Sequence, residues 1–119
     1  MSRAAREAAG RRAERVAALF LQLKGYRVLA RRFRTPVGEI DMVARRGTRL
    51  AFVEVKTRTD ASALGDVLTA RQRERIARAA EAFLKQRPQE GVAAIGFDLV
   101  TVSARYWPSH LRDAWRVGD

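Results

Sequence analysis

The 119-residue chain has the length of one domain, carries a formal net charge of +11 and contains no cysteine. Hydrophobic residues (47%) and charged residues (31%) occur in globular proportions, which excludes a disordered chain. The lack of cysteine excludes disulfides, thiolate metal sites and cysteine nucleophiles. No apolar run approaches membrane-spanning length, and residues 1–10 lack the apolar segment of a signal peptide. We therefore expect a soluble, cytoplasmic protein with one domain over residues 1–119 and no membrane contact.

The positive charge is concentrated near the amino terminus. Residues 1–35 contain ten Arg or Lys against only Glu7 and Glu14, so they carry +8 of the total charge. Such asymmetry is typical of a surface that binds a polyanion, because each neutralised phosphate releases counterions. It favours nucleic acid over two alternatives that stay open at this point, a solvated charged face and a surface for anionic lipid.

The spacing of apolar residues predicts six elements in the order helix, three strands, helix, strand. Gly25 is a stop signal for the first helix, while Thr69 and Gln72 form a capping box that begins the second. We expect helices at 4–23 and 70–87, strands at 26–33, 39–44, 50–57 and 97–102, a loop at 58–66 and a tail from Trp107. The expected fold is α/β with an αβββαβ core, a mixed central sheet flanked by helices.

Two carboxylates are expected to meet on neighbouring strands. Side chains alternate between the two faces of a strand, so Glu54 and Lys56 share one face. A hairpin with an even-numbered loop centred on Gly47 and Thr48 places Asp41 directly opposite Glu54. Facing carboxylates repel and cost stability, which a protein tolerates where a divalent cation lies between them. Hard oxygen ligands suit Mg²⁺ or Mn²⁺, so Asp41 and Glu54 are candidate metal ligands.

Lys56 is the third residue of this candidate site. The chain uses arginine for 21 of its 24 basic residues, so a lysine within a strand indicates that an ammonium is needed there. A lysine can orient a water, share in deprotonating it or offset phosphate charge, whereas arginine stays protonated. The alternative is a weak, exposed Glu54–Lys56 ion pair beside solvated carboxylates. The apolar character of residues 52–55 favours the site, because charges in a buried strand need a reason.

Two segments also resemble a known family. Residues 38–43 (GEIDMV) and 52–58 (FVEVKTR) resemble the two signature segments of the YraN-like family of uncharacterised bacterial proteins. That family is similar to archaeal Holliday-junction resolvases and to the PD-(D/E)xK nuclease superfamily. The resemblance covers nearly the whole chain, including residues 10–17, 97–98 and 110–115.

This resemblance implies a restriction-endonuclease-like fold and a metal-dependent endonuclease that acts on branched or structured DNA. It assigns Asp41 and Glu54 as metal ligands, Lys56 as the catalytic lysine and Glu14 as a further acidic residue at the site. The alternative for Glu14 is a helix-surface pair with Arg11 or Arg15. Relatives often carry a lysine near the start of the second long helix, where this chain has Gln72, and the capping box explains that glutamine.

The candidate nucleic-acid contacts are arginines. The first set lies in the first helix and the second follows helical spacing in the second helix, where an exposed charged face is an equal alternative. The two sets are Arg11, Arg12 and Arg15, and Arg71, Arg75 and Arg78. His110, the only histidine, is expected to be structural. Trp107 and Trp115 can stack on bases, although packing or a subunit contact in a homodimer is the simpler expectation.

Three functions follow from these observations. The first is a Mg²⁺- or Mn²⁺-dependent endodeoxyribonuclease, and DNA is its expected partner. The second is a non-catalytic nucleic-acid-binding module that retains a nuclease-like scaffold. The third is a protein-interaction subunit whose basic face meets an acidic partner. Metal binding separates the first function from the others, and salt-sensitive DNA binding separates the second from the third.

Overall fold

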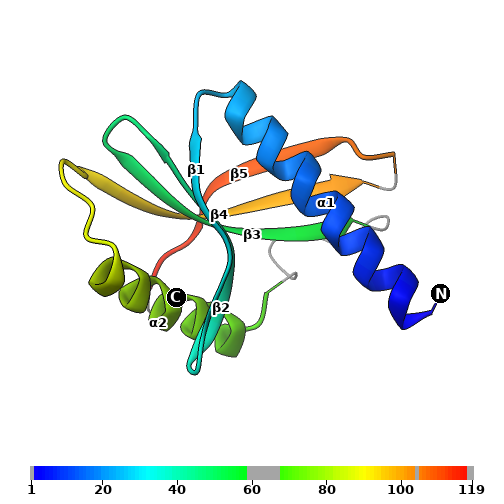
Figure 1. Ribbon diagram of the computed structural model, residues 1–119, viewed down its shortest axis with the longest axis horizontal. Helices are drawn as coiled ribbons and strands as arrows, with labels where there is room; N and C mark the ends of the chain where they lie inside the picture. Colours follow the sequence, from blue (N-terminus) through cyan, green and yellow to red (C-terminus); the bar gives the residue numbers. More distant parts are fainter. Residues whose placement is uncertain (1, 59–67, 104, 118–119) are drawn as a thin grey trace.

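The chain folds into a five-stranded mixed sheet with one helix on each face (Figure 1). The computed structural model describes residues 2–58, 68–103 and 105–117. The strand order is β1-β2-β3-β4-β5, with β3 and β4 parallel and the other neighbours antiparallel. The elements are α1 (Arg3–Leu23), β1 (Arg27–Thr35), β2 (Gly38–Arg46), β3 (Arg49–Arg58), α2 (Ala70–Gln86), β4 (Ala94–Ser103) and β5 (Pro108–Trp115). This mixed α/β arrangement is compatible with the predicted restriction-endonuclease-like core.

The strand β5 is the main difference from the expected order. Residues 108–115 were expected in a tail, but they form an edge strand that pairs with β4. Only Trp115 of this strand is buried, so its sequence carries no alternation of apolar and polar residues that would indicate a strand. The loop predicted at 58–66 falls almost entirely on 59–67, outside the described residues.

The helix α1 is bounded by two capping arrangements. The Ser2 side chain accepts a hydrogen bond from the Ala5 amide at its start. At its end Gly25 adopts a φ of +93°, and the amides of Gly25 and Tyr26 donate to carbonyls of the last turn. The three- and four-residue spacing of apolar residues predicts a buried stripe on α1 that includes Ala13, Ala17 and Leu23. Ala13 and Ala17 are buried, but Leu23 is 88% exposed and Leu21 is buried instead.

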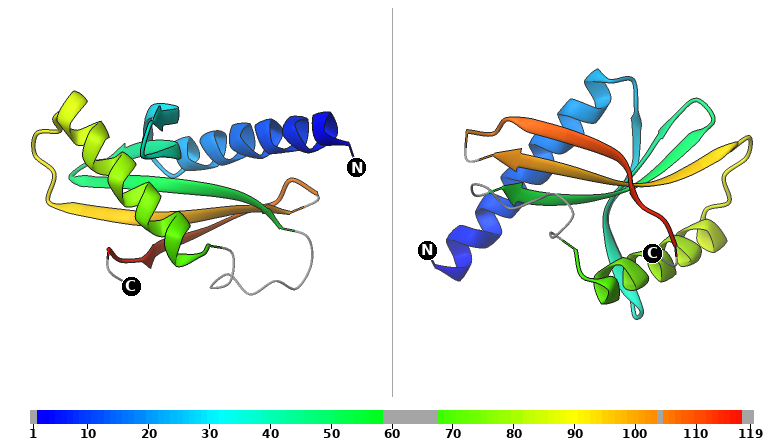
Figure 2. Two further views of the ribbon diagram at one scale, coloured as in Figure 1. Left: turned by 90° about the horizontal axis from the view of Figure 1, so that it is seen from below. Right: turned by 180° about the vertical axis from the view of Figure 1, so that it is seen from behind.

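Each helix covers one apolar face of the sheet (Figure 2). The face under α1 is built from small and β-branched residues such as Ala51, Val53 and Val100. The face under α2 is larger and aromatic, with Phe52, Phe83, Phe97 and Trp115 among its members. Apolar spacing predicts that the second helix packs through Leu68, Ile76, Ala79, Ala80, Phe83 and Leu84, and all of these lie in or against this core. Its predicted capping box is confirmed as well, since the Gln72 amide donates to the Thr69 side chain. Neither described helix is long and apolar enough to cross a lipid bilayer.

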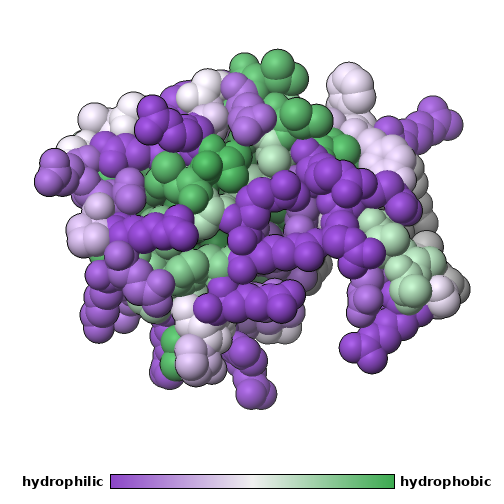
Figure 3. Space-filling view, viewed as in Figure 1, coloured by the Kyte–Doolittle hydropathy of each residue, from purple (hydrophilic) through white to green (hydrophobic). Residues whose placement is uncertain are grey.

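The surface above α1 is divided between two kinds of side chain (Figure 3). Hydrophilic side chains spread over most of this face, whereas hydrophobic ones gather near the carboxyl end of α1. Leu19 and Leu23 are the exposed hydrophobic residues of that helix.

A tight hairpin sets the register of β2 against β3. Arg46 pairs with Arg49, so the loop consists of Gly47 and Thr48 alone, as the sequence analysis required. Gly47 adopts a φ of +58°, a conformation that a glycine takes without steric cost. The register then continues to Met42 opposite Val53.

A second close contact fixes the far end of β2. A Cβ built on Gly38 would collide with the backbone of Arg75 in α2. Only glycine therefore permits this approach, and it holds the β1–β2 hairpin directly against α2.

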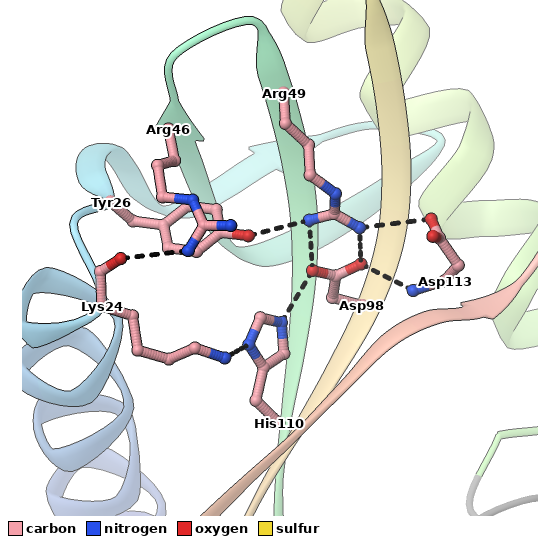
Figure 4. A network of polar contacts seen from close by, with 7 residues as sticks. All are labelled: Lys24, Tyr26, Arg46, Arg49, Asp98, His110 and Asp113. Carbon is pink, nitrogen blue, oxygen red and sulfur yellow. Dashed lines mark hydrogen bonds and ion pairs between the residues drawn. The ribbon is translucent and has the colours of Figure 1, made fainter.

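A buried polar network ties the other end of the sheet together (Figure 4). Arg49 donates two hydrogen bonds, of 2.7 and 2.8 Å, to the carboxylate of Asp98, which is completely buried. His110 Nε2 lies 2.8 Å from the same carboxylate, and the Asp113 amide donates to it at 3.0 Å. Burial alone would raise the pKa of Asp98, but these partners hold that pKa far below its usual range.

The network also reaches the end of α1. The Lys24 ammonium lies 2.6 Å from His110 Nδ1 and donates to it, which leaves the Nε2–H of His110 to donate to Asp98. Arg49 donates a further hydrogen bond of 3.1 Å to the Tyr26 hydroxyl. His110 is thus structural, as expected, because it links α1 through β5 to β4.

Removal of Asp98 is predicted to destabilise the fold strongly. Asp98→Ala leaves Arg49 as a buried charge without its main partner, and should lower the free energy of unfolding by about 3–5 kcal/mol. Urea denaturation followed by circular dichroism measures this loss. The control is Glu74→Ala in the exposed Glu74–Arg78 pair, which should cost less than about 1 kcal/mol. Similar losses in the two variants would contradict the prediction.

Candidate active site

The candidate site lies where β2 and β3 separate. The β2–β3 pairing ends at Met42 and Val53, one residue before Asp41 and Glu54. Beyond that point β2 continues along β1 and turns toward α2, while β3 continues along β4 (Figure 1). Asp41 and Glu54 therefore stand at the two sides of a fork, opposite each other in the extended register, as predicted.

The Asp41 side chain spans this fork. Its Oδ2 accepts a hydrogen bond of 2.8 Å from the Val55 amide, a donor that the β2–β3 ladder no longer satisfies. The strict alternation expected for β2 is wrong here, because Ile40 packs with Val43 on the α2 face rather than with Met42. Arg32, which lies opposite Asp41 on β1, has a φ of +51°. Both β1 and β2 therefore depart from regular strand geometry at the fork.

Glu54 and Lys56 share the α2 side of β3, as expected. Phe52, two residues earlier, belongs to the core under α2, whereas Val53 and Val55 pack under α1. The Lys56 ammonium lies 3.4 Å from Glu54 Oε1. The Glu54 side chain is 13% exposed and that of Lys56 is 32% exposed, so this pair is not the fully solvated ion pair of the alternative interpretation.

Asp41 and Glu54 each make ionisation of the other less favourable. Burial, followed by the charge of Asp41, raises the pKa of Glu54 to about 8, although Lys56 lowers it in part. Burial also raises the pKa of Asp41, against the opposing hydrogen bond from Val55. The two side chains lie close enough for ionisation of Asp41 to disfavour that of Glu54. A divalent cation would offset this repulsion, so the donor set fits a hard cation.

The donor set is small. In the part of the chain that the structure describes, no group of three or more acidic or histidine side chains lies close enough to hold one metal ion. Two protein carboxylates leave open positions for water and for a substrate phosphate, which is how Mg²⁺ commonly binds.

Glu14 lies near the pair without joining it. Its negative charge contributes to the raised pKa of Asp41, after the effects of burial and hydrogen bonding. Its carboxylate accepts a hydrogen bond of 2.7 Å from Arg32, and its side chain is 14% exposed. The expected alternatives, a pair with Arg11 or Arg15, are wrong, because the partner comes from β1 instead.

The amino-terminal end of α2 forms the other wall of the site. A depression of about 260 Å³ contains Asp41 and Glu54 and is closed by Gln72 and Arg75. Of the three arginines predicted as contacts in the second helix, Arg75 is the one that lies beside the carboxylates. Arg71 does not line this depression, and Arg78 donates to Glu74 on an exposed face of α2.

Four arginines gather beside α1. Arg11 and Arg15, one helical turn apart, line a depression of about 320 Å³ together with Arg31 and Arg32 of β1. Among the described residues, no acceptor pairs with Arg11, Arg15 or Arg31. The neighbouring depression shares Arg11 and Arg32 with this one and includes Glu14 and Glu39, and Glu39 also lines the carboxylate depression. A continuous surface therefore leads from the arginines to Asp41 and Glu54.

Arg12 does not belong to this surface. Its guanidinium donates a hydrogen bond of 2.9 Å to the hydroxyl of Tyr106, in the turn between β4 and β5. Arg31 and Arg32 were not predicted as contacts. The available signal was that these two basic residues are adjacent in a strand, where side chains normally alternate between the two faces.

A larger depression, of about 610 Å³, lies away from the carboxylates, between α2 and the start of β4. Its lining is mainly apolar and includes Leu84, Ile95 and Val117. It contains none of Asp41, Glu54 and Lys56, so the candidate chemistry does not lie there.

Comparison with known proteins identifies the family. The model of the uncharacterised protein family UPF0102 matches residues 13–102, which include every residue of the fork. The chain belongs to this family. A UPF0102 protein of Parvibaculum lavamentivorans is 51% identical over 107 residues, which cover 90% of this chain and 80% of the relative. A relative from Maricaulis maris is 47% identical over 121 residues, covering all of this chain and 95% of its own.

Another UPF0102 protein, from Methylorubrum extorquens, is 47% identical over 108 residues, or 91% of this chain and 84% of the relative. These matches confirm the resemblance on which the sequence analysis relied. The family name states no activity, so the function of the fork is argued from its chemistry.

The raised pKa of Glu54 predicts how stability depends on pH without metal. The unfolded carboxyl ionises near its ordinary pKa of 4.5, whereas the folded one stays protonated until about pH 8. The unfolded state therefore binds fewer protons between these values, so stability should fall as the pH rises through this window. Glu54→Gln removes this titration and should flatten the decline.

Thermal unfolding of both proteins in EDTA between pH 5 and pH 8.5 measures the effect. Asp98, whose pKa is held low, affects stability only at more acidic pH and does not interfere. Equal slopes for the parent and Glu54→Gln would show that Glu54 ionises normally in the folded protein.

Proposed function

We propose that the protein is a Mg²⁺- or Mn²⁺-dependent endonuclease that hydrolyses phosphodiester bonds in DNA. The observation that carries this proposal is the meeting of Asp41, Glu54 and Lys56 at the fork between β2 and β3. Two partly buried carboxylates that repel each other are costly to ionise unless a cation lies between them. Similarity of the YraN-like family to Holliday-junction resolvases supports branched or structured DNA as the substrate.

Each residue of the fork has a defined part in this proposal. Asp41 and Glu54 would hold the cation, which when bound supplies positive charge to polarise the phosphate and to acidify a water. The Val55 amide fixes the orientation of Asp41 by its hydrogen bond. Lys56 stands beside Glu54, where it can orient the attacking water, share in removing its proton and offset charge that develops on the phosphate. Hydrolysis then forms the bond between the water oxygen and phosphorus and breaks the bond between phosphorus and the sugar oxygen. The water loses a proton in this step, and the leaving sugar oxygen takes one up to become a hydroxyl.

The arginine depression supports nucleic acid as the ligand. Four guanidinium groups that surround one hollow repel one another, and three of them lack an acceptor among the described residues. A run of backbone phosphates would neutralise them, and the shared depressions would lead the same strand to the carboxylates. Arg75 would contact the phosphate next to the fork.

The second candidate is a nucleic-acid-binding module without catalysis. The unpaired arginines favour it as much as they favour a nuclease, because they concern binding alone. The fork distinguishes the two, since a binding module gains nothing from two carboxylates that repel phosphate.

The first test of the proposal is cleavage. The substrates are junction, flap, single-stranded and linear DNA with Mg²⁺, Mn²⁺ or EDTA. Lys56→Ala should lower the cleavage rate about 100-fold or more while DNA affinity stays nearly unchanged, because one of many cations contributes little to binding. Lys56→Arg should fail as well, since it keeps the charge but changes the shape and cannot release a proton.

Rescue by Lys56→Arg would assign a purely electrostatic role to the lysine. If the parent cleaves none of these substrates with either metal, the binding module replaces the nuclease. Mn²⁺ titration calorimetry on Asp41→Ala and Glu54→Ala serves as an independent check, because both variants should lose the ion.

The second test concerns binding. Combined Arg11→Ala, Arg15→Ala and Arg31→Ala should reduce the slope of log affinity against log salt by up to about three, if each residue contacts one phosphate. The control removes the same charge from exposed positions outside these depressions, Arg27, Arg78 and Arg112. Fluorescence anisotropy with a labelled duplex measures both slopes. Equal reductions would show that net charge, rather than the depression, determines binding.

A further inference from the structure

The two tryptophans have opposite environments. Trp115 is 5% exposed and stacks on Phe97, with ring centroids 5.7 Å apart. Trp107 is 76% exposed, and within the described residues its ring has no aromatic or cation–π contact. Of the two alternatives expected for the tryptophans, packing is found for Trp115 but not for Trp107.

The turn that carries Trp107 is held by several hydrogen bonds. The Ser103 hydroxyl accepts from the Trp107 amide at 3.0 Å, and the Ser103 amide donates to the Trp107 carbonyl at 3.0 Å. Tyr106 donates its amide to the Ser103 carbonyl and adopts a φ of +60°, which is unusual and costly for an aromatic residue. Arg12 of α1 donates to the Tyr106 hydroxyl and so fixes this residue from a second element. These hydrogen bonds fix the backbone from which the exposed ring of Trp107 projects.

The surroundings of the ring favour an anionic ligand with a flat aromatic group. Residues 99–112 contain no Asp or Glu, whereas Arg105 is next to the turn and Arg12 contacts it. Trp107 and Tyr106 are exposed aromatic residues set among the polar residues Ser103, Arg105 and Ser109, a mixed surface rather than the contiguous apolar patch that often marks a protein partner. Tryptophan stacks on the face of any base and gains affinity without reading its sequence.

The turn between β4 and β5 also lies at the end of the sheet toward which β3, the strand of Glu54 and Lys56, runs. Lys56 pairs with Thr101 and Arg58 pairs with Ser103, the residue that anchors the turn. Figure 1 shows the ends of β3 and β4 and the amino-terminal half of α1 on the same side of the molecule. A strand bound along α1 would therefore pass this turn.

We propose that Trp107 is a stacking platform for an unpaired nucleobase. The ligand of this protein would then contain a single-stranded or unstacked segment, because the bases inside a regular duplex already stack on each other. This inference rests on the proposed nucleic-acid function and narrows its substrate. It concerns binding and is independent of whether the fork cleaves.

The Trp115→Phe variant isolates the signal, since it leaves Trp107 as the only tryptophan. An oligothymidylate of about 12 nucleotides should quench its emission, whereas a blunt hairpin duplex should not. An RNA of corresponding sequence tests whether the sugar of the ligand affects binding. Quenching by either the DNA or the RNA strand supports stacking. In the otherwise unchanged protein, Trp107→Ala should weaken single-strand binding about 5- to 150-fold and Trp107→Phe much less.

The matched control is Leu23→Ala, which removes an exposed hydrophobic residue at the other end of α1 and should leave binding unchanged. Circular dichroism shows whether Trp115→Phe folds. If it folds poorly, the affinity of Trp107→Ala, measured by fluorescence anisotropy, still tests the proposal. Single-strand binding with unaltered Trp107 emission, or equal quenching by strand and duplex, would overturn the stacking proposal while the nucleic-acid function stands. Absence of binding to every nucleic acid would overturn both.

Discussion

The buried pair of Arg49 and Asp98 is the interaction on which the arrangement of this sheet depends. Arg49 begins β3 and Asp98 lies in β4, so the pair joins the two parallel strands, which no hairpin connects. Through His110 and the Asp113 amide, the same carboxylate also holds the edge strand β5. Parallel register is otherwise set only by packing. The position of Glu54 along the sheet therefore depends on a charge pair at the opposite end of its own strand.

Among the described residues, the Asp98 network and the Asp41–Glu54 fork both contain buried carboxyl groups, and the two differ in their electrostatic surroundings. Asp98 accepts hydrogen bonds from Arg49, His110 and the Asp113 amide, and its pKa lies far below the ordinary value. At the fork, burial and mutual repulsion raise the pKa of both Asp41 and Glu54. A carboxylate that accepts several charge-assisted hydrogen bonds stabilises a fold, whereas two buried carboxyl groups that disfavour each other's ionisation cost stability. This contrast separates the structural cluster from the candidate catalytic one.

Sequence reasoning located the helices, four of the strands and the fork, because each depends on local signals. The two-residue hairpin of Gly47 and Thr48 fixed which side Glu54 faces, and the capping box placed the start of α2. Strand β5 was not predicted, because an edge strand exposes most of its side chains and its sequence then lacks an alternation of apolar and polar residues. Arg49 looked like a polar hairpin residue, since nothing local indicates a partner 49 positions away. The break in alternation at Ile40 likewise follows from packing against α2, which the strand sequence does not encode.

The contact between Gly38 and the backbone of Arg75 has a mechanical consequence. It packs the β1–β2 hairpin against the amino-terminal half of α2 backbone to backbone, with no room for a side chain between them. A larger residue at position 38 would push the hairpin away from the helix. Asp41 follows three residues later in β2, and Arg75 borders the same depression as Asp41 and Glu54, so this displacement would change the shape of the fork. The geometry of the candidate site is therefore sensitive to a position that carries no functional group.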